Sequence, residues 1–229
     1  MTEQNTNHPI CNYPAKEQVA YLQLLASLLH IDQEFSEAER SKLDNFMNEL
    51  NIATDQRGLV YSSVFSVTEE ETARLTQVIH DLKASDLKYT LVSDLCIFAL
   101  ADSKFTDDEY QHILKLANLL GIEKDQVDAI RSVQENLKTI EDLPSKSNQH
   151  KEIVKKCASS LASAGVPIAA IAASGSVLGL SAAGITSGLA ALGALVGGSM
   201  LAGAVIVVPA LAIGAGFAVK KLIDVVWKD

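Results

Sequence analysis

Residues 21–52 read YLQLLASLLHIDQEFSEAERSKLDNFMNELNI, and residues 91–122 read LVSDLCIFALADSKFTDDEYQHILKLANLLGI. The two stretches align without a gap at an offset of 70. Both contain D-x-x-F-[ST]-x-x-E, followed by apolar residues at i, i+3 and i+7. Agreement at so many gapless positions indicates a duplicated helical hairpin.

The [ST]-x-x-E element is the pattern of a capping box, in which the hydroxyl accepts from the amide of the third helical residue and the Glu side chain reaches back. Three such pairs occur: Ser36 with Glu39, Thr106 with Glu109, and Thr68 with Glu71. Phe35 and Phe105 directly precede two of the caps, where an apolar residue fixes the angle at which the chain enters the helix.

Apolar periodicity and these start signals predict seven helices, near 15–30, 36–50, 55–65, 69–84, 86–101, 106–120 and 124–140. No strand is predicted, so the expected fold class is all-α. The expected domains are a polar N-terminal tail (1–14), a helical bundle (15–142), a linker (143–156) and a glycine-rich hydrophobic membrane segment (157–229).

Charge separates the chain into two parts. Up to Lys156 there are 16 Lys and Arg against 26 Asp and Glu, whereas residues 157–219 contain no Asp, Glu, Lys, Arg or His. An acidic first part argues against nucleic acid, which needs a basic face. The polar N-terminus has no apolar signal region, and the three cysteines do not suggest a disulfide scaffold, so the first part is expected in a reducing compartment, the cytoplasm.

The two repeats resemble the TerB-like family, which is named after bacterial tellurite-resistance proteins. The resemblance covers roughly residues 17–140 and rests on four residues of each repeat, Asp32, Phe35, Ser36 and Glu39, then Asp102, Phe105, Thr106 and Glu109. It implies an all-α bundle with pseudo-twofold symmetry. The family often has Gly directly after the Asp, where this chain has Gln33 and Ser103.

The acidic turns are the candidate cation site, with four candidate ligands: Asp32, Glu39, Asp102 and Glu109. The family resemblance implies a divalent cation there. Against it, calcium takes six to eight oxygens from a longer loop, and the two glutamates are expected to cap helices. The expectation is therefore no cofactor, with a divalent cation as the alternative.

No catalytic group is predicted. The five histidines are scattered, and there is no nucleophile elbow, phosphate-binding loop or dinucleotide fingerprint. The chain is therefore not expected to be an enzyme.

The uncharged stretch is long enough for two membrane spans of about 20 residues each, expected near 166–190 and 200–221. It holds 11 of the 13 glycines. Several lie four residues apart, which allows close helix packing, and the predicted packing residues are Gly175, Gly179, Gly184, Gly188, Gly193, Gly197 and Gly203. The stretch weakly resembles small interferon-inducible membrane proteins and bacteriocin hairpins.

Basic residues flank this stretch, and Trp227 follows it. The predicted membrane-interface residues are Lys155, Lys156, Lys220, Lys221 and Trp227. Positive residues stay inside, so both flanks are expected in the cytoplasm and the number of spans is even.

Two functions remain open. The first is a membrane-anchored TerB-like sensing or adaptor protein of the bacterial inner membrane, active in envelope or toxic-ion stress. Its expected partners are membrane lipid, further copies of itself and other membrane or stress proteins. The alternative is a secreted pore-forming or membrane-perturbing effector whose hairpin inserts into a target bilayer.

Overall fold

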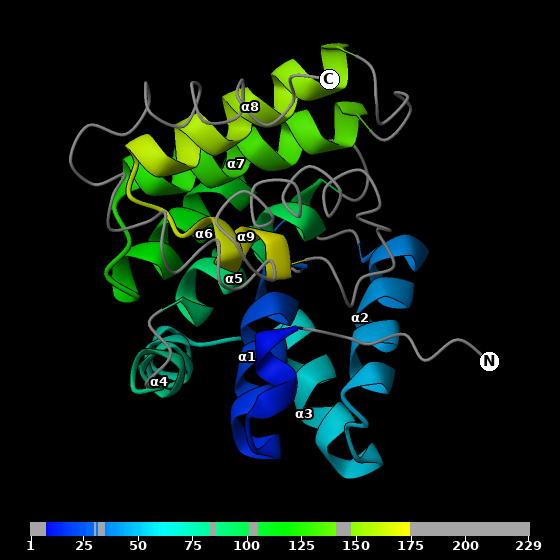
Figure 1. The fold of residues 1–229 in the computed structure, drawn as a ribbon. Helices are drawn as coiled ribbons and strands as arrows, with labels where there is room; N and C mark the ends of the chain where they lie inside the picture. Colours follow the sequence, from blue (N-terminus) through cyan, green and yellow to red (C-terminus); the bar gives the residue numbers. More distant parts are fainter. Residues whose placement is uncertain are drawn as a thin grey trace. The chain divides into compact units, whose positions relative to one another are not determined.

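The computed structural model describes residues 8–29, 31, 35–82, 86–100, 105–140 and 148–174, and within these ranges it contains helices and no strand (Figure 1). The prediction of an all-α chain is confirmed for this part. A short 3-10 helix, η1 (Pro9–Asn12), is followed by α1 (Ala15–Leu28), α2 (Glu37–Glu49), α3 (Thr54–Phe65), α4 (Glu69–His80), α5 (Leu87–Ala99), α6 (Asp107–Leu119), α7 (Lys124–Ile140), α8 (Asn148–Ser163) and α9 (Ile168–Ala173).

The helices belong to two compact units. The first contains η1 and α1 to α6, together with Ala173 and Ser174. The second contains α7 from Asp125 onward, α8, and α9 as far as Ala172.

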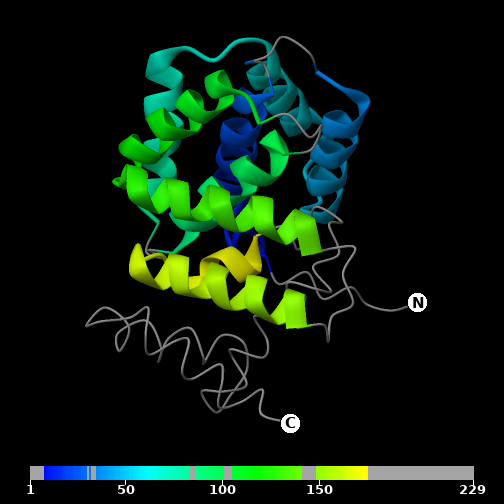
Figure 2. The same ribbon diagram turned by 90° about the horizontal axis from the view of Figure 1, so that it is seen from above.

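Helix α1 is the centre of the first unit, where it contacts η1 and each of α2 to α6. Every residue from Val19 to Leu28 is buried, and Figure 2 shows this dark-blue helix enclosed by the others of its unit. A helix that is buried on all sides shows no strong apolar stripe. Helix α5, its counterpart in the second repeat, is buried without interruption from Thr90 to Ala99.

The offset between the repeats reappears in the helix ends. Helices α2 and α6 start 70 residues apart and end 70 residues apart. Both begin with a complete capping box, at Ser36 and at Thr106, as predicted. The described parts of residues 21–52 and 91–122 therefore have the same local structure.

The third predicted capping box is only half formed. Thr68 Oγ1 accepts from the backbone N–H of Glu71 at 3.1 Å. The Glu71 carboxylate pairs with Arg74 at 2.5 Å instead of reaching back to the cap. An Arg three residues further along the helix is a nearer charged partner for this exposed Glu.

The predicted N-terminal tail is folded from His8 onward. His8 and Ile10 are buried, and η1 contacts α1. Gln18 secures this segment, because its Nε2 donates to the Tyr13 carbonyl at 2.8 Å. Residues 8–14 therefore belong to the first unit, although their polar composition predicted a tail.

In the second unit, α8 crosses the predicted boundary between linker and membrane segment at 156/157. Its buried residues follow a helical i, i+3, i+4, i+7 pattern, and they are Val154, Cys157, Ala158 and Leu161. Figures 1 and 2 show α7 and α8 side by side. The first uncharged residues therefore complete an amphipathic helix.

Helix α8 ends at a glycine with left-handed backbone. Gly165 has φ +70°, and Val166 N–H donates to the Leu161 carbonyl at 2.9 Å, as in a Schellman motif. Pro167 then precedes the six-residue α9. Of the helix expected over 166–190, residues 168–173 are helical, and residues 175–190 lie outside the described residues.

Candidate functional site

The two repeat glutamates proposed as cation ligands are buried capping groups. Glu39 Oε2 accepts from the N–H of Ser36 at 2.8 Å and from its hydroxyl at 2.7 Å. Glu109 Oε2 accepts from the N–H of Thr106 at 2.7 Å and from its hydroxyl at 2.9 Å. One oxygen of each carboxylate is thus bonded to the start of its own helix.

The other two proposed ligands, Asp32 and Asp102, lie outside the described residues. Within the part of the chain that the structure describes, no three His, Cys, Asp or Glu side chains gather as a metal site would require. Cation binding at the acidic turns stays a prediction.

The residues predicted for the membrane are described only at the start of that segment. Lys155 and Lys156 lie on α8, where Lys155 Nζ pairs with Glu152 at 3.1 Å. No described helix is long and apolar enough to cross a membrane. The remaining predicted residues lie outside the described ranges: Gly175, Gly179, Gly184, Gly188, Gly193, Gly197, Gly203, Lys220, Lys221 and Trp227.

A buried carboxylate lies in the middle of α5. The Asp94 side chain is 0% exposed. Its Oδ2 accepts from the Tyr21 hydroxyl of α1 at 2.6 Å and lies 2.9 Å from His8 Nε2. A carboxylate removed from water needs such donors, since an unpaired buried charge is strongly unfavourable.

The backbone sets the tautomer of His8. The N–H of Ile10 donates to His8 Nδ1 at 3.3 Å, so this nitrogen is an acceptor. The proton of the neutral imidazole therefore lies on Nε2 and is donated to Asp94. In this arrangement the segment before α1 supplies one of the donors that a central carboxylate requires.

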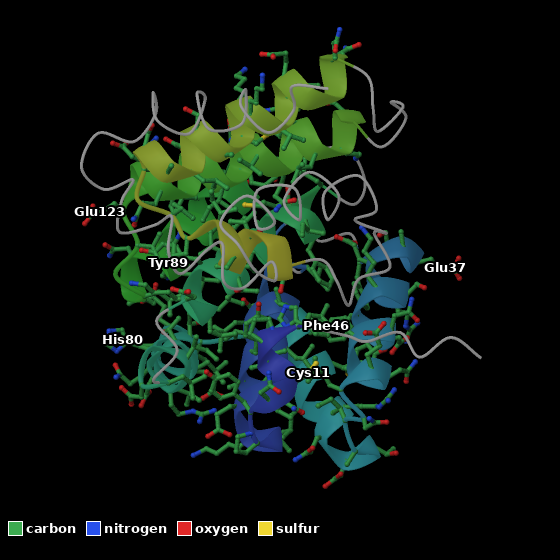
Figure 3. The ribbon with its side chains drawn as sticks, in the orientation of Figure 1. Cys11, Glu37, Phe46, His80, Tyr89 and Glu123 are labelled. Atoms are coloured by element: carbon green, nitrogen blue, oxygen red, sulfur yellow. The ribbon has the colours of Figure 1, made fainter. Side chains whose placement is uncertain are left out.

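Aromatic rings surround the imidazole. The His8 ring centroid is 5.2 Å from that of Phe46 and 5.6 Å from that of Tyr21, both edge to face. Figure 3 shows Phe46 turned inward from α2, whereas Glu37 on the same helix points away.

Burial, and then the charge of Asp94, raises the pKa of Tyr21 well above its usual value. Tyr21 therefore stays protonated as a donor.

A second carboxyl group, that of Glu49, lies within electrostatic range of His8. Burial raises the pKa of Glu49, and a positive charge on His8 would oppose that rise. The side chain is half-buried, and its Oε2 atom is buried without a hydrogen-bond partner in the described structure. The surroundings of His8 thus include acidic groups from α2 and α5.

The residue next to Asp94 makes a long-range bond as well. Ser93 Oγ lies 2.7 Å from Ser174 Oγ, and both side chains are buried. Ser174 is the last described residue before the glycine-rich stretch. Two consecutive residues of α5 therefore bind segments from the two ends of the described chain.

A serine and a histidine also meet between α1 and α6. Ser27 Oγ donates to the Leu24 carbonyl at 2.8 Å and lies 3.0 Å from His112 Nε2. Since the hydroxyl has only one proton, His112 must donate to it. Burial, and then the charge of Lys115, lowers the pKa of His112 to about 4. The pair is therefore a neutral bridge between helices, in which the imidazole does not act as a base toward Ser27.

The family model for the tellurite resistance protein TerB matches residues 18–132, which is half of the chain and contains both repeats. The chain belongs to the TerB family. No curated protein and no solved structure matches it significantly.

The Asp94 cluster extends beyond the TerB match. Tyr21, Ser93 and Asp94 lie within the matched residues, whereas His8 and Ser174 lie outside them. The cluster therefore joins the TerB domain to its two flanking segments.

Sequence reasoning did not find this cluster, although one signal was present. Asp94 is a charged residue inside the apolar run LVSDLCIFAL, and at the offset of 70 it aligns with Leu24. A carboxylate at a position where the other repeat has Leu is expected to be buried, and a buried carboxylate needs a hydrogen-bond donor. Nothing in the polar segment before α1 indicated that His8 is this partner.

Proposed function

We propose that this chain is a membrane-anchored TerB protein whose helical domain acts as a cytoplasmic sensing or adaptor module in envelope or toxic-ion stress. The observation that carries the proposal is the order of its parts. A TerB domain is followed in the same chain by residues 157–219, which carry no charged residue and no histidine.

We place the membrane part after Ser174. Helices α8 and α9 use the first uncharged residues, and residues 175–219 still leave room for two spans of about 20 residues each. Helices have little hydrophobic drive to associate inside lipid, so close contact at small residues becomes important. The glycine spacing therefore supports association with further copies of the chain. Basic residues on both flanks favour the cytoplasmic side of the bacterial inner membrane.

We propose an adaptor role in preference to catalysis because two clusters of polar groups among the described residues of the first unit are engaged in packing. Asp94 is bonded to Tyr21 and His8, and Ser27 is bonded to His112. The expected partners are membrane lipid, the chain itself and other membrane or stress proteins. The acidic balance disfavours nucleic acid.

Fractionation of cells that contain the native protein tests the anchor. We expect the protein to stay with the membranes in alkaline carbonate and to leave them only in detergent. Release by carbonate, or recovery in the soluble fraction, would contradict the proposal. A protein known to be peripheral and one known to be integral serve as controls in the same fractions.

The effector alternative is supported by the abundance of Ala and Gly in residues 157–219, which makes the stretch only moderately hydrophobic. Such a chain could be soluble first and insert later. Purification without detergent, followed by dye release from lipid vesicles, separates the two functions. A soluble monomer that releases the dye supports the effector, and strict membrane residence supports the anchor.

A further inference from the structure

Ser93 and Asp94 are consecutive residues of α5, and each binds one of the two segments that flank the TerB match. Asp94 accepts from His8, and Ser93 is bonded to Ser174. We propose that this pair is a coupling point, through which the segment His8–Asn12 controls the attachment of Ser174, the last described residue before the apolar stretch. This coupling goes beyond the proposed function, and it does not depend on whether the apolar stretch after Ser174 spans a membrane.

The N-terminal segment is short. Its buried side chains are His8, which is 1% exposed, and Ile10. Gln18 binds the Tyr13 carbonyl, and Pro14 then leads into α1. Elements with few buried contacts open at lower free energy than the core. The segment can therefore detach while α1 and α5 stay folded.

Detachment would change the surroundings of Asp94. Its carboxylate would keep the Tyr21 bond but lose the donor on His8 Nε2. A buried charge that loses a donor must admit water or move toward solvent. A move of the carboxylate toward solvent displaces the middle of α5.

Ser93 lies in the same helical turn, so a shift at Asp94 also moves its hydroxyl. The 2.7 Å bond to Ser174 depends on both distance and angle, and it weakens when either changes. Release of His8 therefore loosens Ser174. Coupling of this kind is reciprocal, so loosening Ser174 weakens the His8 attachment by the same factor.

Hydrogen exchange of the purified full-length chain, in detergent where solubility requires it, tests the coupling. We expect His8→Gln to speed exchange in the peptide that contains Ser174 by about fivefold or more, the lower range of measured couplings. Exchange in α6 should stay unchanged. His80→Gln is the matched control, because His80 is exposed on α4 and lies 3.8 Å from Asp81; it should change neither region.

Ser93→Ala tests the reverse direction. It should speed exchange in residues 8–13 by the same factor as His8→Gln does at Ser174. A faster exchange confined to residues 8–13 in His8→Gln, or a uniform rise that includes α6, would overturn the proposal.

A double-mutant cycle with Asp94→Asn supplies a second test. The amide removes the buried charge, so the need for the His8 donor falls. Adding His8→Gln to Asp94→Asn should then produce little further exchange at Ser174, whereas equal effects in both backgrounds would overturn the coupling.

Discussion

Asn51 and Gly121 have the same left-handed backbone conformation at the same position of the two repeats, with φ 52° and 66°. The next residue of each repeat, Ile52 or Ile122, donates its N–H to a carbonyl five residues earlier at 2.9 Å. This is the bond of a Schellman motif, which ends a helix by bonding its last free carbonyls. Both α2 and α6 therefore end in the same way, although only one repeat has glycine.

Gly121→Ala should destabilise the chain by about 1 kcal/mol, because a Cβ disfavours left-handed backbone. A Cβ at this position would meet no atom within 4 Å, so the strain arises from φ alone. Urea unfolding followed by circular dichroism measures the change.

Gly58→Ala is the matched control for this prediction. Gly58 lies inside α3, and a Cβ there also meets no atom within 4 Å. Since Ala favours a helix interior, the same substitution should stabilise here by about 0.5–1 kcal/mol. Two changes of the same sign would contradict the conformational argument.

Ser36→Ala and Thr106→Ala should each lower the free energy of unfolding by about 1–2 kcal/mol, since each leaves a helix start uncapped and removes a donor from a buried glutamate. Thr68→Ala should have a smaller effect, because its glutamate pairs with Arg74. Thermal melting of the three variants checks the order. Equal losses at all three positions would show that the complete box adds nothing.

Tyr21→Phe should destabilise by about 1.5–3 kcal/mol, because it removes a donor from a buried carboxylate. Tyr61→Phe is the matched control: Tyr61 also donates to a carboxylate, that of Asp44, but it is only half-buried. Its loss should be below about 1 kcal/mol. Unfolding in urea distinguishes them, and an equal loss would show that burial of Asp94 does not strengthen its dependence on donors.

His112 should make the fold less stable in acid. Its pKa is lowered from 6.5 to about 4 in the folded chain, so the unfolded chain binds more protons between these values. The stability that this imidazole contributes is therefore present above about pH 6.5 and is lost as the pH falls toward 4, by about 3 kcal/mol in total.

His112→Gln keeps a donor for Ser27 and removes the titration, so the loss of stability between about pH 7 and about pH 5 should become smaller. His80→Gln is the control, because His80 is exposed (Figure 3). Denaturant unfolding at both pH values measures the difference. An unchanged pH dependence in His112→Gln would contradict the assignment.

Gly179→Leu and Gly188→Leu test the proposed packing of the membrane segment. Leucine keeps the segment apolar and able to insert, but it pushes a neighbouring backbone away. We expect the double variant to reach the membrane and to lose oligomers in crosslinking. Asp102→Ala should have a milder effect. If Asp102→Ala abolished the oligomers and the double glycine variant did not, oligomerisation would depend on the acidic turn.

The sequence by itself determined helices α1 to α7, the capped starts of α2 and α6, the duplication and the TerB resemblance. The helices and their caps depend on residues within a few positions of each other, as Ser36 and Glu39 show, so local pattern predicts them. The duplication is found by comparing two stretches of the sequence with each other. The extent of α8 was harder to predict, since this helix takes its buried residues from both sides of the predicted boundary at 156/157.

Only the tertiary structure decided what lies around Asp94. Its partners Tyr21 and His8 are 73 and 86 positions away along the chain, and no local pattern connects residues so far apart. Burial makes such bonds necessary, because a carboxylate without water must find donors in the protein. Which residue supplies them depends on how the segment before α1 packs, and the polar composition of that segment is compatible with solvent as well.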